Sequence, residues 1–174
     1  MSIKKDSKHK LLKCIFVGEN DVGKSAIFYR FFNGVFPQYP TCGLDFKIFP
    51  LKIGNEEIRY QFWDLYQTNR DYRLKCYQQT SILIMTYDIT NRHSFLNIQN
   101  YYEDFVKYGI KKSVLALVGN KNDQKEFRQV SFLEGQELGE SLGVEFFEVS
   151  ALTGYKIKDL YDFLINKSIE RSYF

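Results

Sequence analysis

An eight-residue stretch rich in glycine constrains this chain more than any other part of its sequence. It runs Gly18-Glu19-Asn20-Asp21-Val22-Gly23-Lys24-Ser25. One apolar run, residues 11–17, comes directly before it, and a second, residues 26–32, comes directly after it. The pattern Gly-x4-Gly-Lys-Ser between a predicted strand and a predicted helix is typical of a phosphate-binding loop. A glycine-rich turn that binds nothing is the alternative, and the two flanking elements argue against it.

The residue types of this loop suit a phosphate chain. Gly18 and Gly23 let the backbone curl so that successive N–H groups point inward at an anion. The residues in this curl are Asn20, Asp21, Val22, Gly23 and Lys24. Lys24 also supplies a mobile positive charge for the outer phosphates. Ser25 begins a helix whose N-terminal dipole favours an anion, and its hydroxyl can ligate Mg²⁺.

Length, charge and cysteine content narrow the class of protein. The chain has 174 residues, which is enough for one domain with a substantial core. A net charge of +3 does not indicate a nucleic-acid partner, and the basic residues near the start predict a flexible basic N-terminus over residues 1–9. Three scattered cysteines without metal-ligand spacing fit free thiols in a reducing compartment.

The sequence carries no signal-peptide core, no apolar membrane span and no lipidation motif. We therefore expect a cytoplasmic protein with no membrane anchor in the chain as given. A lipidated tail outside this sequence would change that assignment.

Apolar patterns predict six strands, at residues 11–17, 44–53, 56–62, 81–87, 114–118 and 144–149. The second and third are joined by Gly54-Asn55 as in a β-hairpin, and Pro50 indicates an edge strand or a bulge. Helices are expected after the phosphate loop, over residues 91–108, after the capping box Ser131 to Glu134, and over residues 156–169. Residues 65–79 are weakly patterned and predict a mobile loop with a poor helix. The alternation predicts one α/β domain over residues 10–174: a doubly wound, mostly parallel six-stranded sheet with helices on both faces and one antiparallel hairpin strand.

Two short motifs follow the last two predicted strands. Asn120-Lys121-Asn122-Asp123 follows residues 114–118, and Ser150-Ala151-Leu152 follows residues 144–149. Ligands of such sheets bind at the carboxyl ends of the strands. The Asp123 carboxylate can accept hydrogen bonds from both N–H groups on one edge of guanine, each worth about 1.5–3 kcal/mol. The backbone N–H of Ala151 can donate to guanine O6, whereas adenine offers Asp123 no such donors.

Together these motifs resemble those of the Ras-superfamily small GTPases, most closely the Rab branch. Residues 41–47 (Thr-Cys-Gly-Leu-Asp-Phe-Lys) are similar to the Rab stretch T-I-G-x-D-F-K. Trp63-Asp64 matches the start of W-D-T-A-G-Q-E, and residues 87–95 are close to Y-D-V-T-N-x-x-S-F. The resemblance covers roughly residues 10 to 170 and implies the P-loop NTPase fold of a small G domain. It also implies GTP or GDP with Mg²⁺, and effector, exchange-factor and activating proteins that bind through residues 33–47 and 64–79.

The resemblance further implies roles for single residues. Ser25, Thr41 and Asp64 would bind the metal, Asp64 through water. Thr41 would sense the γ-phosphate through Mg²⁺. Ala26 would add a backbone N–H to the phosphates, and Phe36 would pack against the base.

The residues that would hold guanine are Asn120, Lys121, Asp123, Ser150, Ala151 and Leu152. The lysine that usually follows Ser-Ala in the family is Leu152 here, and the backbone contact does not need it.

The chain departs from the family after Trp63-Asp64, where Gln67 stands in place of a glycine and Thr68 in place of the water-orienting glutamine. This loop is also shorter than in typical Rabs, so a gap could instead bring Gln67 into the place of that glutamine. Threonine cannot span the distance to an attacking water as glutamine does. These changes predict slow hydrolysis and weak switching, with nucleotide binding spared.

Three functions remain open on the sequence. The leading one is a Rab-like GTPase in vesicle traffic or signalling, with Lys24, Mg²⁺ and the loop N–H groups assisting attack of water on the γ-phosphate. The second is a pseudo-GTPase, which holds nucleotide for stability and presents a surface to other proteins. An ATP-using enzyme is the third, and Asp123 argues against it.

Overall fold

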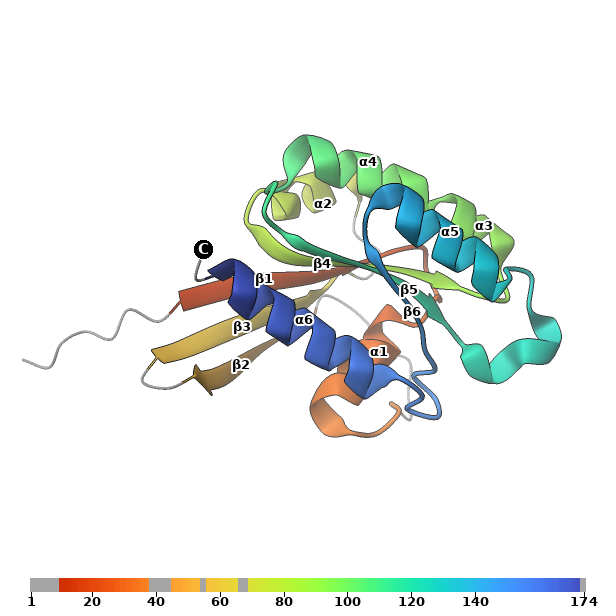
Figure 1. Ribbon diagram of the computed structural model, residues 1–174, viewed down its shortest axis with the longest axis horizontal. Coiled ribbons are helices and arrows are strands. Elements are labelled where there is room, and N and C mark those ends of the chain that lie inside the picture. The colour runs from red at the N-terminus through yellow and green to blue at the C-terminus, as the bar shows by residue number, and fades with distance from the viewer. Residues whose placement is uncertain (1–9, 38–44, 54–55, 66–68, 173–174) are drawn as a thin grey trace, which may run out of the picture.

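The computed structural model describes residues 10–37, 45–53, 56–65 and 69–172 (Figure 1). Six strands form one sheet in the order β2-β3-β1-β4-β5-β6. Their bounds are β1 Lys10–Val17, β2 Asp45–Ile53, β3 Glu56–Asp64, β4 Thr80–Asp88, β5 Val114–Asn120 and β6 Glu145–Glu148. All neighbours pair in parallel except β2 with β3, which are antiparallel. The predicted mostly parallel sheet with one hairpin is confirmed, and β2, which contains Pro50, lies at the edge of the sheet.

Helices cover both faces of this sheet (Figure 1). Their bounds are α1 Lys24–Asn33, α2 Arg70–Tyr77, α3 Arg92–Leu96, α4 Ile98–Tyr108, α5 Phe132–Leu142 and α6 Ile157–Ser172, and a 3₁₀ helix, η1, spans Asn122–Phe127. Helices α1 and α6 lie on one face, and α2 to α5 lie on the other (Figure 1). None of these helices is both long and apolar enough to cross a membrane.

Strand β1 runs through the middle of the sheet and divides the core in two. Cys14 and Phe16 face α1 and α6 and are fully buried, as a strand period of two requires. Ile15 and Val17 face the opposite side and pack in the second cluster, with α2, α4 and α5. Since both faces are covered, β1 is anchored on both sides up to the residue at which the phosphate loop begins.

The structure differs from the sequence prediction in two helical regions. Residues 70–77 form helix α2, although the pattern of residues 65–79 predicted mainly a loop. Its start is fixed by Asn69, whose side-chain oxygen accepts a hydrogen bond of 2.9 Å from the N–H of Tyr72. The expected helix over residues 91–108 is interrupted at Asn97, which separates α3 from α4, and it ends at Gly109 as predicted.

Candidate functional site

The phosphate loop lies between β1 and α1, and only glycine fits at two of its positions. Gly18 and Gly23 have φ angles of 143° and 92°, in the region that disfavours side chains. A Cβ atom at Gly18 would lie 2.0 Å from the carbonyl oxygen of Thr86. At Gly23 it would lie 2.2 Å from Nδ2 of Asn120. The curled backbone expected of an anion-binding loop is therefore present, with β4 and β5 packed directly behind it.

Lys24 is folded back over this loop. Only 4% of the residue is exposed, and its Nζ donates to the carbonyl oxygens of Gly18 (3.0 Å) and Glu19 (2.6 Å). Burial lowers the pKa of Lys24, and the nearby charge of Asp64 opposes that shift. A buried ammonium held at this curled loop is arranged to neutralise an anion bound there.

Two of the predicted metal-binding residues lie side by side. The hydroxyl of Ser25, at the start of α1, donates to Oδ2 of Asp64, at the end of β3. Oxygen ligands of this kind suit Mg²⁺, which usually keeps several waters and takes its remaining ligands from one or two side chains and substrate phosphates. Among the described residues no group of three or more His, Cys, Asp and Glu side chains could hold a metal. The hydroxyl and the carboxylate are oxygen donors of the kind that magnesium accepts beside water and phosphate.

Asn120 joins the phosphate loop to the loop that follows β6. Its Nδ2 donates to the carbonyl oxygen of Val22 at 2.9 Å, and its Oδ1 accepts from the N–H of Ala151 at 3.1 Å. Only 2% of Asn120 is exposed, so both hydrogen bonds are shielded from water. Motifs that are 98 and 31 residues apart in sequence therefore meet at one buried amide.

Asp123 is held at the surface, where a ligand can reach it. The hydroxyl of Ser150 donates to its Oδ1, and the N–H of Thr153 donates to that hydroxyl oxygen at 3.1 Å. Lys121 adopts a left-handed backbone with φ 68°, and its Nζ lies 2.6 Å from Oδ2 of Asp88. Residues of both predicted guanine motifs are thus in direct contact, and Asp123 is exposed.

Comparison with known proteins agrees with this geometry. Residues 13–170 match the model of the Ras family. This chain belongs to the Ras family. It is 37% identical to Ras-related protein RabC of Dictyostelium discoideum over 89% of its own length and 82% of the relative. It is 32% identical to GTP-binding protein ypt2 of Schizosaccharomyces pombe, over 92% of this chain and 82% of that protein. It is also 32% identical to Ras-related protein SEC4 of Candida albicans, over 87% of this chain and 74% of that protein.

The structure describes only some of the other residues predicted for the nucleotide site of this Rab-like small GTPase. Ala26 follows Ser25 within the first turn of α1, and Phe36 is 41% exposed in the segment after that helix. The N–H of Ala151, expected to donate to guanine O6, donates to Asn120 in this structure. Leu152 is half exposed at the surface. Thr41, Gln67 and Thr68 lie outside the described residues.

Arg30 of this Ras-family chain is a site residue that no motif indicated. It lies in the last turn of α1, and its Nε donates to the carbonyl oxygen of Ala151 at 2.9 Å. Its Nη1 donates to the carbonyl oxygen of Gly34 at 2.6 Å, and its Nη2 donates to that of Leu152. One guanidinium therefore connects the predicted guanine loop to the end of α1. A single arginine within an apolar helix gave no sequence signal for this role.

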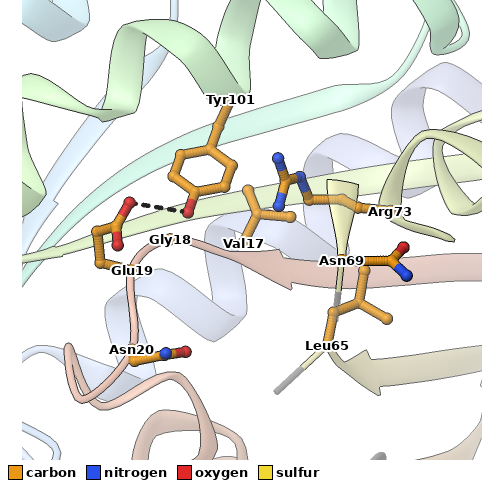
Figure 2. A pocket seen from close by; sticks show the side chains of 8 residues that line it. All are labelled: Val17, Gly18, Glu19, Asn20, Leu65, Asn69, Arg73 and Tyr101. Atoms are coloured by element: carbon orange, nitrogen blue, oxygen red, sulfur yellow. Dashed lines mark hydrogen bonds between the residues drawn. The ribbon is translucent and has the colours of Figure 1, made fainter. Parts of the chain in front are cut away.

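A pocket of about 300 Å³ lies beside the phosphate loop, between the loop and helices α2 and α4 (Figure 2). Its wall includes Glu19, whose Oε1 accepts from Nδ2 of Asn97 at 2.9 Å and from the hydroxyl of Tyr101 at 3.2 Å. Tyr101 is 8% exposed and packs in the second core cluster, and it also lines this pocket. Burial, followed by the charge of Glu19, raises the pKa of Tyr101 to about 12, so the hydroxyl remains a donor at neutral pH.

Proposed function

We propose that this protein binds GTP and GDP together with Mg²⁺ and hydrolyses GTP slowly, as a Rab-like switch in vesicle traffic or signalling. The contact that carries the proposal is Asn120, whose one buried amide joins Val22 of the phosphate loop to Ala151 of the predicted guanine loop. A site built in this way is suited to a ligand with a base at one end and phosphates at the other. The names of the relatives, Ras-related and GTP-binding, support the same proposal.

Each part of the chain has a distinct task in this proposal. The N–H groups of residues 20–26 and the ammonium of Lys24 hold the phosphates and orient them. The hydroxyl of Ser25 and Thr41 would hold magnesium directly and the carboxylate of Asp64 would hold it through water; the ion would supply neutralising charge to the phosphates. Asp123 accepts from the base, supported by Ser150. Phe36 and Lys121 flank the base, and Ala151 and Leu152 place backbone at its far edge.

Slow hydrolysis follows from the residues after Asp64. A family member normally orients the attacking water with a glutamine, and this chain has Thr68 there, or Gln67 if the shortened loop shifts the register. Phosphate binding by the loop and Lys24 does not depend on either residue. We therefore expect tight nucleotide binding combined with a low rate of GTP hydrolysis.

The second candidate is a pseudo-GTPase that binds nucleotide for stability and presents residues 33–47 and 64–79 to effector, exchange-factor or activating proteins. The replacement of Gly-Gln by Gln67-Thr68 is the observation that favours it. Single-turnover hydrolysis of bound GTP separates the two candidates. A slow but measurable rate that falls further in Lys24→Ala supports the GTPase, and no turnover above free GTP supports the pseudo-GTPase.

The nucleotide proposal itself is tested by competition between GDP and ADP for the purified full chain. GDP is expected to bind far better, since only guanine provides two donors to Asp123. Asp123→Asn should shift preference to xanthosine diphosphate, which presents an acceptor where guanine has its amino group. Gln124→Ala, an exposed neighbour, is the matched control. Equal affinity of the unmodified protein for GDP and ADP would refute guanine recognition.

A further inference from the structure

The pocket beside the phosphate loop contains a cation that the nucleotide motifs do not include. Arg73 projects from α2 into this pocket, with its guanidinium beside Val17 and to the right of the ring of Tyr101 (Figure 2). Its Cζ lies 4.6 Å from the centre of that ring, and only 16% of its side chain is exposed. Val17 and Gly18, the residues at which β1 passes into the phosphate loop, line the same space.

The charge of Arg73 is only loosely paired. Its closest carboxylate among the described residues is Asp104, with Nη2 3.7 Å from Oδ2. Asp104 is already bound by Arg70, whose Nε and Nη2 donate to its two oxygens at 3.0 and 2.5 Å. The Nε of Arg73 is buried and has no hydrogen-bond partner among the residues that the structure describes. A buried donor of this kind is costly unless it is satisfied, so an anion in the pocket would stabilise it.

Lys24 brings a second positive charge close to this pocket, although it does not line it. Its Nζ is bound to the carbonyl oxygens of Gly18 and Glu19, both of which line the pocket. Burial is the main cause that lowers the pKa of Lys24; the carboxylates of Asp64, Glu19 and Asp21 oppose this shift, and the like charge of Arg73 adds a smaller lowering. Like charges that approach one buried space favour an anion between them.

The one carboxylate in the pocket wall is directed elsewhere. Glu19 accepts from Asn97 and Tyr101 on the far side, and Figure 2 shows its side chain extended toward the tyrosine hydroxyl. Asn20, on the other side of Glu19 in the loop, contributes an amide rather than a charge. Arg73 is therefore the one cation among the described residues that line this pocket.

We propose that Arg73 binds the terminal phosphate of a bound guanosine triphosphate, which makes it a residue that distinguishes the triphosphate from the diphosphate. The inference rests on the proposed function, because the phosphate loop must first hold the nucleotide. In this chain, Arg73 takes over a discriminating contact that the family makes through the glycine replaced at Gln67. The expected source of selectivity thus moves from a backbone N–H to a guanidinium on α2. Since an arginine binds phosphate oxygens in bidentate fashion, its shape matters as well as its charge.

The test measures affinities of the full chain for fluorescent GDP and for a non-hydrolysable fluorescent GTP analogue. Arg73→Gln retains length and polarity but removes the charge, and Arg73→Lys retains only the charge. We expect Arg73→Gln to lower the affinity for the analogue about ten- to a hundred-fold and the affinity for GDP less than about threefold. Arg73→Lys should fall between Arg73→Gln and the unmodified protein. Circular dichroism on each variant confirms that it is folded.

Lys75→Gln is the matched control, since it removes an exposed positive charge from the same helix at a position that does not line the pocket. It should leave the ratio of the two affinities unchanged. If Arg73→Gln leaves that ratio unchanged, for example by lowering the affinity for both nucleotides by the same factor, Arg73 only stabilises the packing of α2 on α4 and the inference is wrong. If the unmodified protein binds neither guanine nucleotide, the proposed function fails first, and this result is distinct from the other.

Discussion

The side-chain amide of Asn120 donates to the backbone carbonyl of Val22 at 2.9 Å, across 98 residues of sequence. The same side chain accepts from Ala151, so the geometry of the phosphate loop and that of the guanine loop are set by one group. Neither loop can shift without stretching a buried hydrogen bond. This arrangement makes the base and phosphate halves of the site mechanically dependent on each other.

Removing this amide should therefore weaken the whole nucleotide site. Asn120→Ala leaves the carbonyl of Val22 and the N–H of Ala151 without their buried partner, at a cost of about 1–3 kcal/mol for each group. We expect GDP to dissociate at least about ten times faster, measured by displacement of a fluorescent GDP. Gln124→Ala, in the same segment but exposed, should leave the rate unchanged. An unaltered rate in Asn120→Ala would contradict the bridging role.

Chelation of magnesium should accelerate nucleotide release. The hydroxyl of Ser25 and the carboxylate of Asp64 lie together at the loop, where an ion would join protein to phosphate. EDTA is expected to raise the off-rate of the GTP analogue more than that of GDP, because the ion also contacts the γ-phosphate. Ser25→Ala should lose most of this sensitivity to EDTA, whereas the exposed Ser141→Ala should keep it. Off-rates indifferent to EDTA in the unmodified protein would rule out the assigned ligands.

Gly135 in α5 should tolerate no side chain, although alanine is the better helix former. A Cβ there would lie 2.4 Å from Cζ of Phe146 and 2.5 Å from the hydroxyl oxygen of Tyr87. Crowding of about 1–3 kcal/mol is expected to outweigh the gain of about 1 kcal/mol from helix propensity. Gly135→Ala should thus lower the free energy of unfolding in urea. Gln136→Ala, at an exposed neighbouring position, should be neutral or stabilising, and a more stable Gly135→Ala would refute the close approach.

Glu134 should make the stability of the folded protein depend on pH in the acid range. Its pKa is lowered from 4.5 to about 2, first by the hydrogen bond from Arg92 and then by the bonds from Ser131 in the capping box. Because the folded-state pKa is below the unfolded one, the stabilisation is present above 4.5 and is lost as the pH falls toward about 2.

Glu134→Gln should therefore lose less stability than the unmodified protein between about pH 6 and about pH 3, as judged by thermal midpoints. Glu137→Gln, one turn away and exposed, is the control for removing a carboxylate from α5. Identical acid sensitivity in both variants and the unmodified chain would show that the cap does not carry the effect.

The sequence was most informative where a local rule dictates structure. Gly18 and Gly23 sit at the positive φ angles that their pattern predicts, and Pro50 lies on the edge strand. Helix α2 was underestimated because its polar surface hides the pattern, although Asn69 and Asp71 are an ordinary cap and first-turn acid. Arg30 and Arg73 could not be found at all. Their roles depend on which loop each helix faces, and that is set by the packing of the two faces of the sheet.

If the chain binds nucleotide as proposed, Arg30 would couple the nucleotide to protein partners. Its guanidinium joins the carbonyls of Ala151 and Leu152 to that of Gly34, where α1 ends and the predicted partner-binding segment begins. A partner that draws Gly34 outward must break a hydrogen bond that also supports the base-binding loop. By linkage, the free energy with which such a partner loosens the nucleotide equals the free energy with which the nucleotide opposes that partner. The residence time of the nucleotide and the affinity for the partner would then be two measures of one coupling through Arg30.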